Sequence, residues 1–143
     1  MKIDNTFFLI GRIRERYKAF LEGEMRNRGL TGLVTSHADI LVALTFCGEL
    51  TLSEVAEKIH RDRSTVTTLV AKLVKLGYVR QRKNEEDNRS SFLSLTERGK
   101  AVIPEMQPIT KLLFEKATAG ISGEEWTAFR QTLEKIYGNF KEA

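Results

Sequence analysis

The spacing of apolar residues along the chain is helical over most of its length. Apolar residues recur every three or four positions, as in a helix that buries one face. This pattern predicts six helices, over about residues 4–28, 36–47, 52–59, 63–76 and 97–119 and from residue 122 onward. Only the segment from residue 78 to residue 95 departs from it, with two short stretches of strand-like composition.

Several of these helices carry a recognisable start. In a capping box a hydroxyl side chain accepts from a backbone N–H of the first turn, and an acid three residues later accepts from the backbone N–H of the hydroxyl residue. Three pairs have this spacing, the last with Asp in place of Glu: Thr51 and Glu54, Ser122 and Glu125, Ser36 and Asp39. Asp62 is the expected N-cap of the helix that begins at residue 63.

The two strand-like segments flank a polar tip. Tyr78–Lys83 and Ser91–Leu95 are expected to pair as a hairpin around "NEEDNRS". A short capped helix, a tight turn, a second helix and this hairpin occur in that order, which is the order of a winged helix-turn-helix. The expected fold class is therefore mainly α with a small antiparallel β wing.

The second helix of this motif opens with "RSTVTT", although Ser, Thr and Val are mediocre helix formers. A helical wheel places the apolar residues on one side and the short hydroxyls on the other. Short hydroxyls permit close approach to base edges in a major groove, whereas the alternative is that Ser64 and Thr65 only cap the helix. The candidate DNA contacts here are Arg61, Arg63, Ser64, Thr65, Thr67, Thr68, Lys72 and Lys75.

Basic charge is concentrated in the same region. Residues 58–83 contain eight Lys or Arg and one acid, a net charge of +7, and the rest of the chain has a net charge of −3. Such a segment favours a polyanionic partner, nucleic acid first, with a solvated basic face as the alternative.

The hairpin tip offers a second set of candidates. An Arg on a projecting hairpin can enter a narrow minor groove, where the potential is most negative. Arg89 has this position, and Asp87 is expected to hold the loop by pairing with it or with a nearby Arg. The candidate wing contacts are Arg82, Lys83, Asp87, Asn88 and Arg89.

Residues 50–104 resemble the DNA-binding core of MarR-family transcriptional regulators. The resemblance rests on "LSEVAEKI", "RSTVTTLVAKLVKLGYV", the wing "DNR" and "LSLTERGK", in the family's order and spacing. It implies one domain over residues 1–143, with a DNA-binding lobe at 34–100 and a helical dimerisation region at 1–30 and 101–143. It also implies a homodimer on a pseudo-palindromic double-stranded DNA operator, acting as a repressor that a small aromatic ligand or cysteine oxidation releases.

An effector site is the least defined part of this prediction. Ligands of the family lie between the dimerisation helices and the DNA-binding lobe. By approximate position the candidates are Arg14 (or Arg12), Tyr17, Phe20, His37 and Phe46. For the aromatic residues a place in the core is the alternative, and for His37 it is a place beside a helix cap or on the surface.

Cys47 is the only cysteine, so a thiol-based redox sensor is an alternative function. No cluster of basic residues adjoins Cys47 to lower its pKa, and a buried, inert thiol is expected. The sequence has no Cys/His pattern with zinc spacing. We therefore expect no metal and no cofactor.

Other functional classes have little support. The apolar run Phe7–Ile10 is too short for a signal peptide or a membrane span. With a single cysteine, this favours a cytoplasmic protein without a membrane partner. No catalytic triad, paired carboxylates or phosphate loop appears, so an enzyme is not expected. A winged helix used as a protein-interaction module is the remaining alternative.

Overall fold

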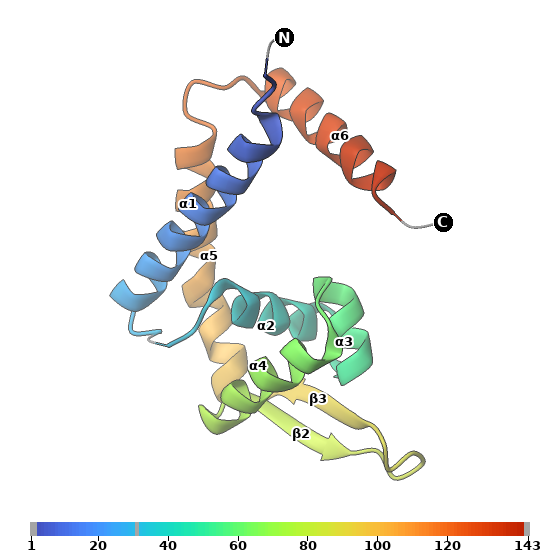
Figure 1. Cartoon of the computed structure of the whole chain (residues 1–143). Coiled ribbons are helices and arrows are strands. Elements are labelled where there is room, and N and C mark those ends of the chain that lie inside the picture. The colour runs from blue at the N-terminus through green and yellow to red at the C-terminus, as the bar shows by residue number, and fades with distance from the viewer. Residues whose placement is uncertain (1–2, 31, 142–143) are drawn as a thin grey trace. The chain divides into compact units, whose positions relative to one another are not determined.

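The computed structural model describes residues 3–30 and 32–141. These residues form six helices and three strands (Figure 1). In chain order they are α1 (Thr6–Asn27), α2 (Thr35–Cys47), β1 (Glu49–Thr51), α3 (Leu52–Ile59), α4 (Arg63–Lys75), β2 (Val79–Lys83), β3 (Ser91–Leu95), α5 (Glu97–Ala117) and α6 (Gly123–Asn139). Each of the six predicted helices is present, so the mainly α fold with a β wing is confirmed.

The chain divides into two compact units, residues 1–110 and residues 111–143. The first contains α1 to α4, the sheet and most of α5. The second contains the last turns of α5 and all of α6. Among the described residues, no helix is long and apolar enough to span a bilayer.

The sheet has one more strand than the predicted hairpin. Its order is β1-β3-β2, with both pairs antiparallel. Leu93, in the central strand, pairs with Leu50 on one side and Gln81 on the other. β1 is only three residues long, which is too short for a periodic signal, and it exists because β3 supplies its hydrogen-bond partners.

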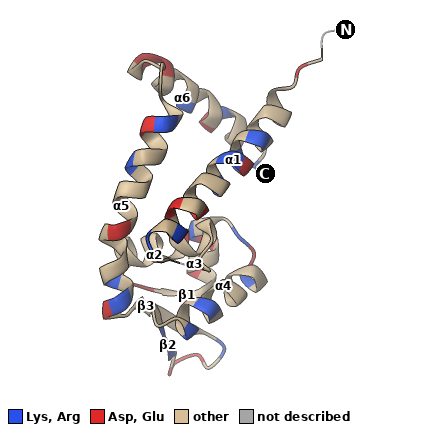
Figure 2. Cartoon of the chain, turned by 90° about the vertical axis from the view of Figure 1, so that its left-hand side faces the viewer, with Lys and Arg blue, Asp and Glu red and all other residues tan. Residues whose placement is uncertain are grey.

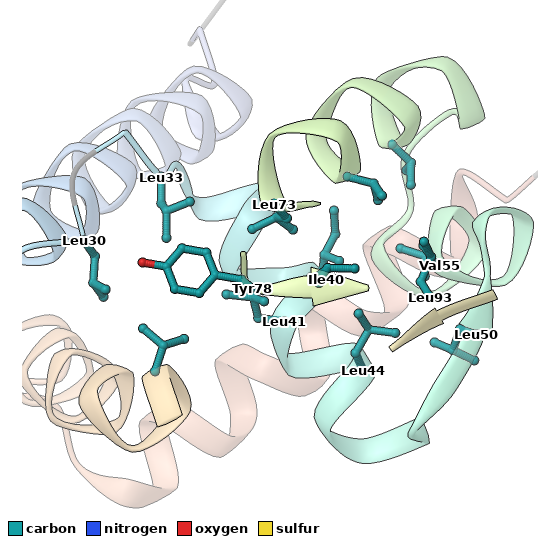
Figure 3. Close-up of a cluster of buried hydrophobic side chains, with 14 of the residues drawn as sticks. Leu30, Leu33, Ile40, Leu41, Leu44, Leu50, Val55, Leu73, Tyr78 and Leu93 are labelled. Atoms are coloured by element: carbon teal, nitrogen blue, oxygen red, sulfur yellow. The ribbon is translucent and has the colours of Figure 1, made fainter. Parts of the chain in front are cut away.

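The core of the first unit lies between the helix-turn-helix and the sheet (Figure 3). Its most completely buried side chains come from α2, α3, α4 and β3: Ile40, Leu41, Leu44, Val55, Val66, Val70, Leu73 and Leu93. Val66, Val70 and Leu73 are the predicted apolar face of α4, and that face is confirmed. The hydroxyl face of α4 is thereby turned away from the core.

Most of the predicted caps are present. The hydroxyl of Thr51 accepts from the N–H of Glu54 at 3.2 Å, and the Glu54 carboxylate accepts from the N–H of Thr51 at 3.1 Å. Ser122 and Glu125 form the same box at the start of α6. Asp62 caps α4 as predicted.

The predicted capping box of Ser36 and Asp39 is wrong. α2 begins one residue earlier, and Nδ1 of His37 accepts from the N–H of Val34 at 2.9 Å. An imidazole nitrogen therefore takes the place of the carboxylate that the sequence pattern suggested. His37 is buried, with 4% of its surface exposed, so it lies beside the cap and not on the surface.

The second unit and the start of α1 expose large apolar side chains. Trp126 packs against Phe114 and Phe129, with ring centroids 5.5 and 5.7 Å apart, yet α6 has no buried residue. In α1, Phe7 and Phe8 are 65% and 70% exposed. Apolar faces of this size normally meet another surface.

Candidate nucleic-acid interface

The turn before α4 is held by one carboxylate. Asp62 accepts from the N–H of Thr65 at 3.0 Å and from the hydroxyl of Thr65 at 2.7 Å. It also accepts from the hydroxyl of Ser64. These hydrogen bonds hold the pKa of Asp62 well below its usual range. Ser64 and Thr65 therefore take part in capping the helix, which was the alternative to contact with base edges. This end of the helix is exposed.

The other two hydroxyls of α4 are bonded to the helix itself. Thr67 donates to the carbonyl oxygen of Arg63 at 2.9 Å, and Thr68 donates to that of Ser64 at 3.3 Å. Such bonds satisfy both hydroxyls within the helix, although bonds of this kind slightly destabilise a helix and do not offset the low propensity of Thr. Both side chains remain exposed to solvent.

Four basic side chains of this region are exposed: Arg61, Arg63, Lys72 and Lys75. In Figure 2, Lys and Arg positions lie along α4 and the wing strands. Two of these side chains also face α2 or the loop before it. Arg61 donates to the hydroxyl of Ser36 at 3.4 Å. The ammonium of Lys72 lies near Gly32. Burial lowers the pKa of His37, and the positive charge of Lys72 lowers it further.

The tip of the wing is a closed loop of local hydrogen bonds. Asp87 accepts from the backbone N–H of Arg89 at 3.0 Å, and the side-chain amide of Asn84 donates to the hydroxyl of Ser90 at 2.9 Å. Asp87 thus pairs with Arg89 as expected, but through the backbone. The guanidinium of Arg89 remains exposed, as do Asn88 and Lys83.

Arg63 joins the start of α4 to the wing. Its Nη2 donates to the carbonyl oxygen of Arg89 at 3.5 Å. The two residues are 26 positions apart in the sequence, and no local pattern indicates this contact. It brings the two predicted DNA-contacting segments together.

Arg82 differs from the other wing candidates. Its guanidinium pairs with the carboxylate of Glu49 at 2.8 Å and lies 4.7 Å from the ring centroid of Phe92. Both partners are on the outer face of the sheet, and Glu49 belongs to the strand that the sequence did not predict. Arg82 is therefore engaged within the sheet.

Arg14 and Tyr17 lie at one cavity, whereas the other effector candidates, Arg12, Phe20, His37 and Phe46, do not line it. Arg14 and Tyr17 line a cavity of about 110 Å³, together with Asp39 and Arg61. Burial raises the pKa of Asp39, and the charge of Arg61 opposes this. His37 is enclosed in the core, whereas Phe46 is 83% exposed, so neither aromatic ring belongs to this cavity. A neighbouring cavity of about 130 Å³ is lined by Leu21, Met25 and Met106.

The expected burial of Cys47 is wrong. α2 ends at this residue, where the chain turns outward through Gly48, and the thiol is exposed. Within the described residues, no group of three or more His, Cys, Asp or Glu is placed to hold a metal ion.

Comparison with known proteins identifies the same region. The family model described as "MarR family" matches residues 35–91, which run from the start of α2 to the start of β3. The HTH-type transcriptional repressor IacR of Pseudomonas putida is 26% identical over 98% of this chain and 82% of its own length. Other curated relatives are matched over only 52–66% of their own length.

Solved structures agree over nearly the whole chain. A MarR-family transcriptional regulator from Silicibacter pomeroyi is 28% identical, with a TM-score of 0.75, covering 96% of this chain and 91% of that one. A mutant of MarR from E. coli, complexed with operator DNA, has a TM-score of 0.81 at 18% identity, covering 95% of this chain and 99% of that one. The second likeness shows the fold alone. Residues 35–91 therefore match a MarR-family domain, and the helix-turn-helix, the wing and these matches support a MarR-family winged-helix transcriptional regulator.

Proposed function

We propose that this protein is a dimeric repressor that binds a specific double-stranded DNA operator. The observation that carries the proposal is the exposed face of α4. It presents four short hydroxyl residues beside Arg61 and Arg63, and Arg63 reaches the wing tip. The name of the relative IacR, a transcriptional repressor, supports the sign of regulation.

The geometry suits both grooves of a duplex. In a helix-turn-helix the N-terminal residues of the second helix approach base edges in the major groove. Ser64 and Thr68 are small enough for this approach, and the exposed N-terminus of α4 favours phosphate. Arg89, on the closed wing tip, would then enter the adjacent minor groove. Because Glu49 already neutralises Arg82, Arg82 is the least suited of the wing candidates.

A dimer would place two such units on one operator. The exposed apolar side chains of α1 and α6 support self-association, because a monomer rarely leaves such faces in water. In this proposal residues 34–100 form the DNA-binding lobe, and residues 1–30 and 101–143 form the dimerisation region. A two-fold dimer would read a pseudo-palindrome with half-sites about one helical turn apart.

A small aromatic effector is the finer part of the proposal. Arg14, Tyr17 and Arg61 would hold its anionic group beside the turn that leads into α4. The cavity holds about 110 Å³, whereas small-molecule sites usually occupy roughly 300–1,000 Å³. Binding would therefore have to widen it, and Arg61 would respond because it belongs to both the cavity and the turn.

The test is selection of genomic DNA fragments by the purified protein, followed by affinity measurements over a range of salt concentrations. An operator-binding protein enriches a few fragments and loses affinity steeply as salt rises. Enrichment of no fragment, or binding that salt does not weaken, would instead favour a protein-interaction module. Repeating the selection with aromatic carboxylates tests the effector separately.

A further inference from the structure

A groove of about 830 Å³ opens where the sheet meets α2 and α5. Its lining residues come from the C-terminal end of α2, from the three strands and from the first turns of α5, all within the first unit. Its volume falls within the range of roughly 300–1,000 Å³ that is typical of small-molecule sites. None of the candidate DNA contacts or effector residues lines it.

One small residue of the sheet lines this groove. Ser94 occupies the middle strand and pairs with Glu49 on one side and Arg80 on the other. The two long side chains flank a serine, which leaves space above the middle of the sheet. At one end the wall is Gly48, at a φ of +78°, where an added Cβ would meet nothing within 4 Å.

The walls are apolar and the rim is basic. Leu44, Leu95 and Ile103 line the groove, and two cations, Arg80 and Lys100, also line it. The acid of the groove, Glu49, is already paired with Arg82 at 2.8 Å.

The two cations are available to a ligand. Lys100 makes an exposed ion pair with Glu97 at 3.4 Å, a kind of pair that contributes little. Arg80 has no ion pair with any residue in the described part of the chain. The groove therefore combines an apolar lining with two cations, of which Lys100 alone has an ion-pair partner, and a weak one, among the described residues.

We propose that this groove binds a small amphipathic anion, such as an aryl or short alkyl carboxylate. The apolar body would pack on Leu44, Leu95 and Ile103. The carboxylate would accept charge-assisted hydrogen bonds from Arg80 and Lys100, and the planar guanidinium matches a carboxylate well. This site is separate from the Arg14 and Tyr17 cavity, and it does not depend on DNA binding.

The experiment is a titration of the ¹⁵N-labelled protein followed by NMR, with 2-naphthoate as the probe and 2-naphthalenemethanol as its neutral counterpart. Naphthoate should shift the amide signals of Gly48, Ser94 and Lys100. The alcohol should bind about tenfold more weakly or worse, since it lacks the charge. The double variant Arg80→Gln, Lys100→Gln should lose the same factor for naphthoate.

Two further variants complete the test. Ser94→Phe fills the groove without altering its charge and should abolish the shifts, while Lys135→Gln on α6 removes one charge elsewhere and should change nothing. Circular dichroism checks that each variant folds. Equal binding of acid and alcohol, unchanged binding by the double variant, or shifts confined to Tyr17 and Asp39 would each overturn the proposal. The last result would leave the effector site near α1 supported.

Discussion

The backbone carbonyl oxygen of Tyr78 lies 2.1 Å from the position that a Cβ on Gly99 would occupy. Gly99 is in the first turn of α5, so the helix can pack against the start of the wing only without a side chain at this residue. Thr96 supports the same junction, since its hydroxyl accepts from the N–H of Gly99 at 3.1 Å.

Gly99→Ala should therefore destabilise the protein. The backbone cannot give way cheaply, and overpacking of this kind costs about 1–3 kcal/mol. Urea unfolding measures the loss. Gly23→Ala is the matched control, because the added Cβ would meet only the flexible end of Arg26 at 3.7 Å. A Gly99→Ala protein as stable as the control would contradict the packing described here.

Stability should fall at mildly acidic pH through His37. Burial, with the charge of Lys72, lowers the pKa of His37 from its ordinary 6.5. Below pH 6.5 the unfolded chain therefore binds a proton more readily than the folded one, and the free energy of unfolding falls. His37→Gln removes this group, so the difference between wild type and variant should shrink between pH 7 and pH 5. A difference that is constant over this range would argue against a buried neutral imidazole.

Two wing arginines should differ in DNA binding. Arg89→Ala should weaken operator binding by about 1–3 kcal/mol, the range for one groove contact. Arg82→Ala should have a smaller effect, because Glu49 already binds this side chain. Fluorescence anisotropy with a labelled operator compares them at one salt concentration. A larger effect of Arg82→Ala would reverse the assignment of the wing.

Two substitutions on the exposed face of α4 should have different effects, one on sequence preference and one on salt dependence. Thr68→Ala should change which operator variants are preferred, since its side chain points outward near the helix start. Lys75→Ala should weaken all sequences alike and reduce the slope of log affinity against log salt by about 1. Competition with mutated operators and a salt series distinguish the two. Identical behaviour of both variants would count against base contacts by Thr68.

Self-association should depend on the apolar face of α1. Phe8→Ser removes a side chain that is 70% exposed. Burial of one Phe contributes about 1.5–3 kcal/mol, so the dimer dissociation constant should rise at least tenfold. Sedimentation equilibrium measures it, with Arg16→Ser as a polar control on the same helix. A wild-type protein that stays monomeric would remove the basis of the dimer proposal.

The sequence predicted the elements whose signals are local. The buried residues of α4 recur at helical spacing, and the Asp62 cap lies within three residues of the groups it binds. Both predictions are confirmed. β1 was missed, because three residues carry no period and the strand depends on β3, about 40 positions away. The pairing of Arg82 with Glu49 followed from that strand and was missed with it.

The burial of His37 and the exposure of Cys47 were also not predicted from the local sequence. A polar residue in an apolar stretch has a local alternative at the surface, yet His37 is buried because its ring nitrogen finds the N–H of Val34. Cys47 follows apolar residues but ends the helix at its exposed edge. Neither outcome depends on composition. Both depend on where the helix begins and ends.

Thr67 and Thr68 commit their hydroxyl protons to carbonyl oxygens one turn earlier, and Ser64 and Thr65 commit theirs to Asp62. In this arrangement the outward face of α4 offers oxygen lone pairs and methyl groups, and no hydroxyl donor. Such a face complements base edges that carry hydrogen-bond donors or apolar groups. In a major groove these are the amino groups of adenine and cytosine and the methyl group of thymine, whereas the oxygen-rich edge of guanine finds no hydroxyl donor there.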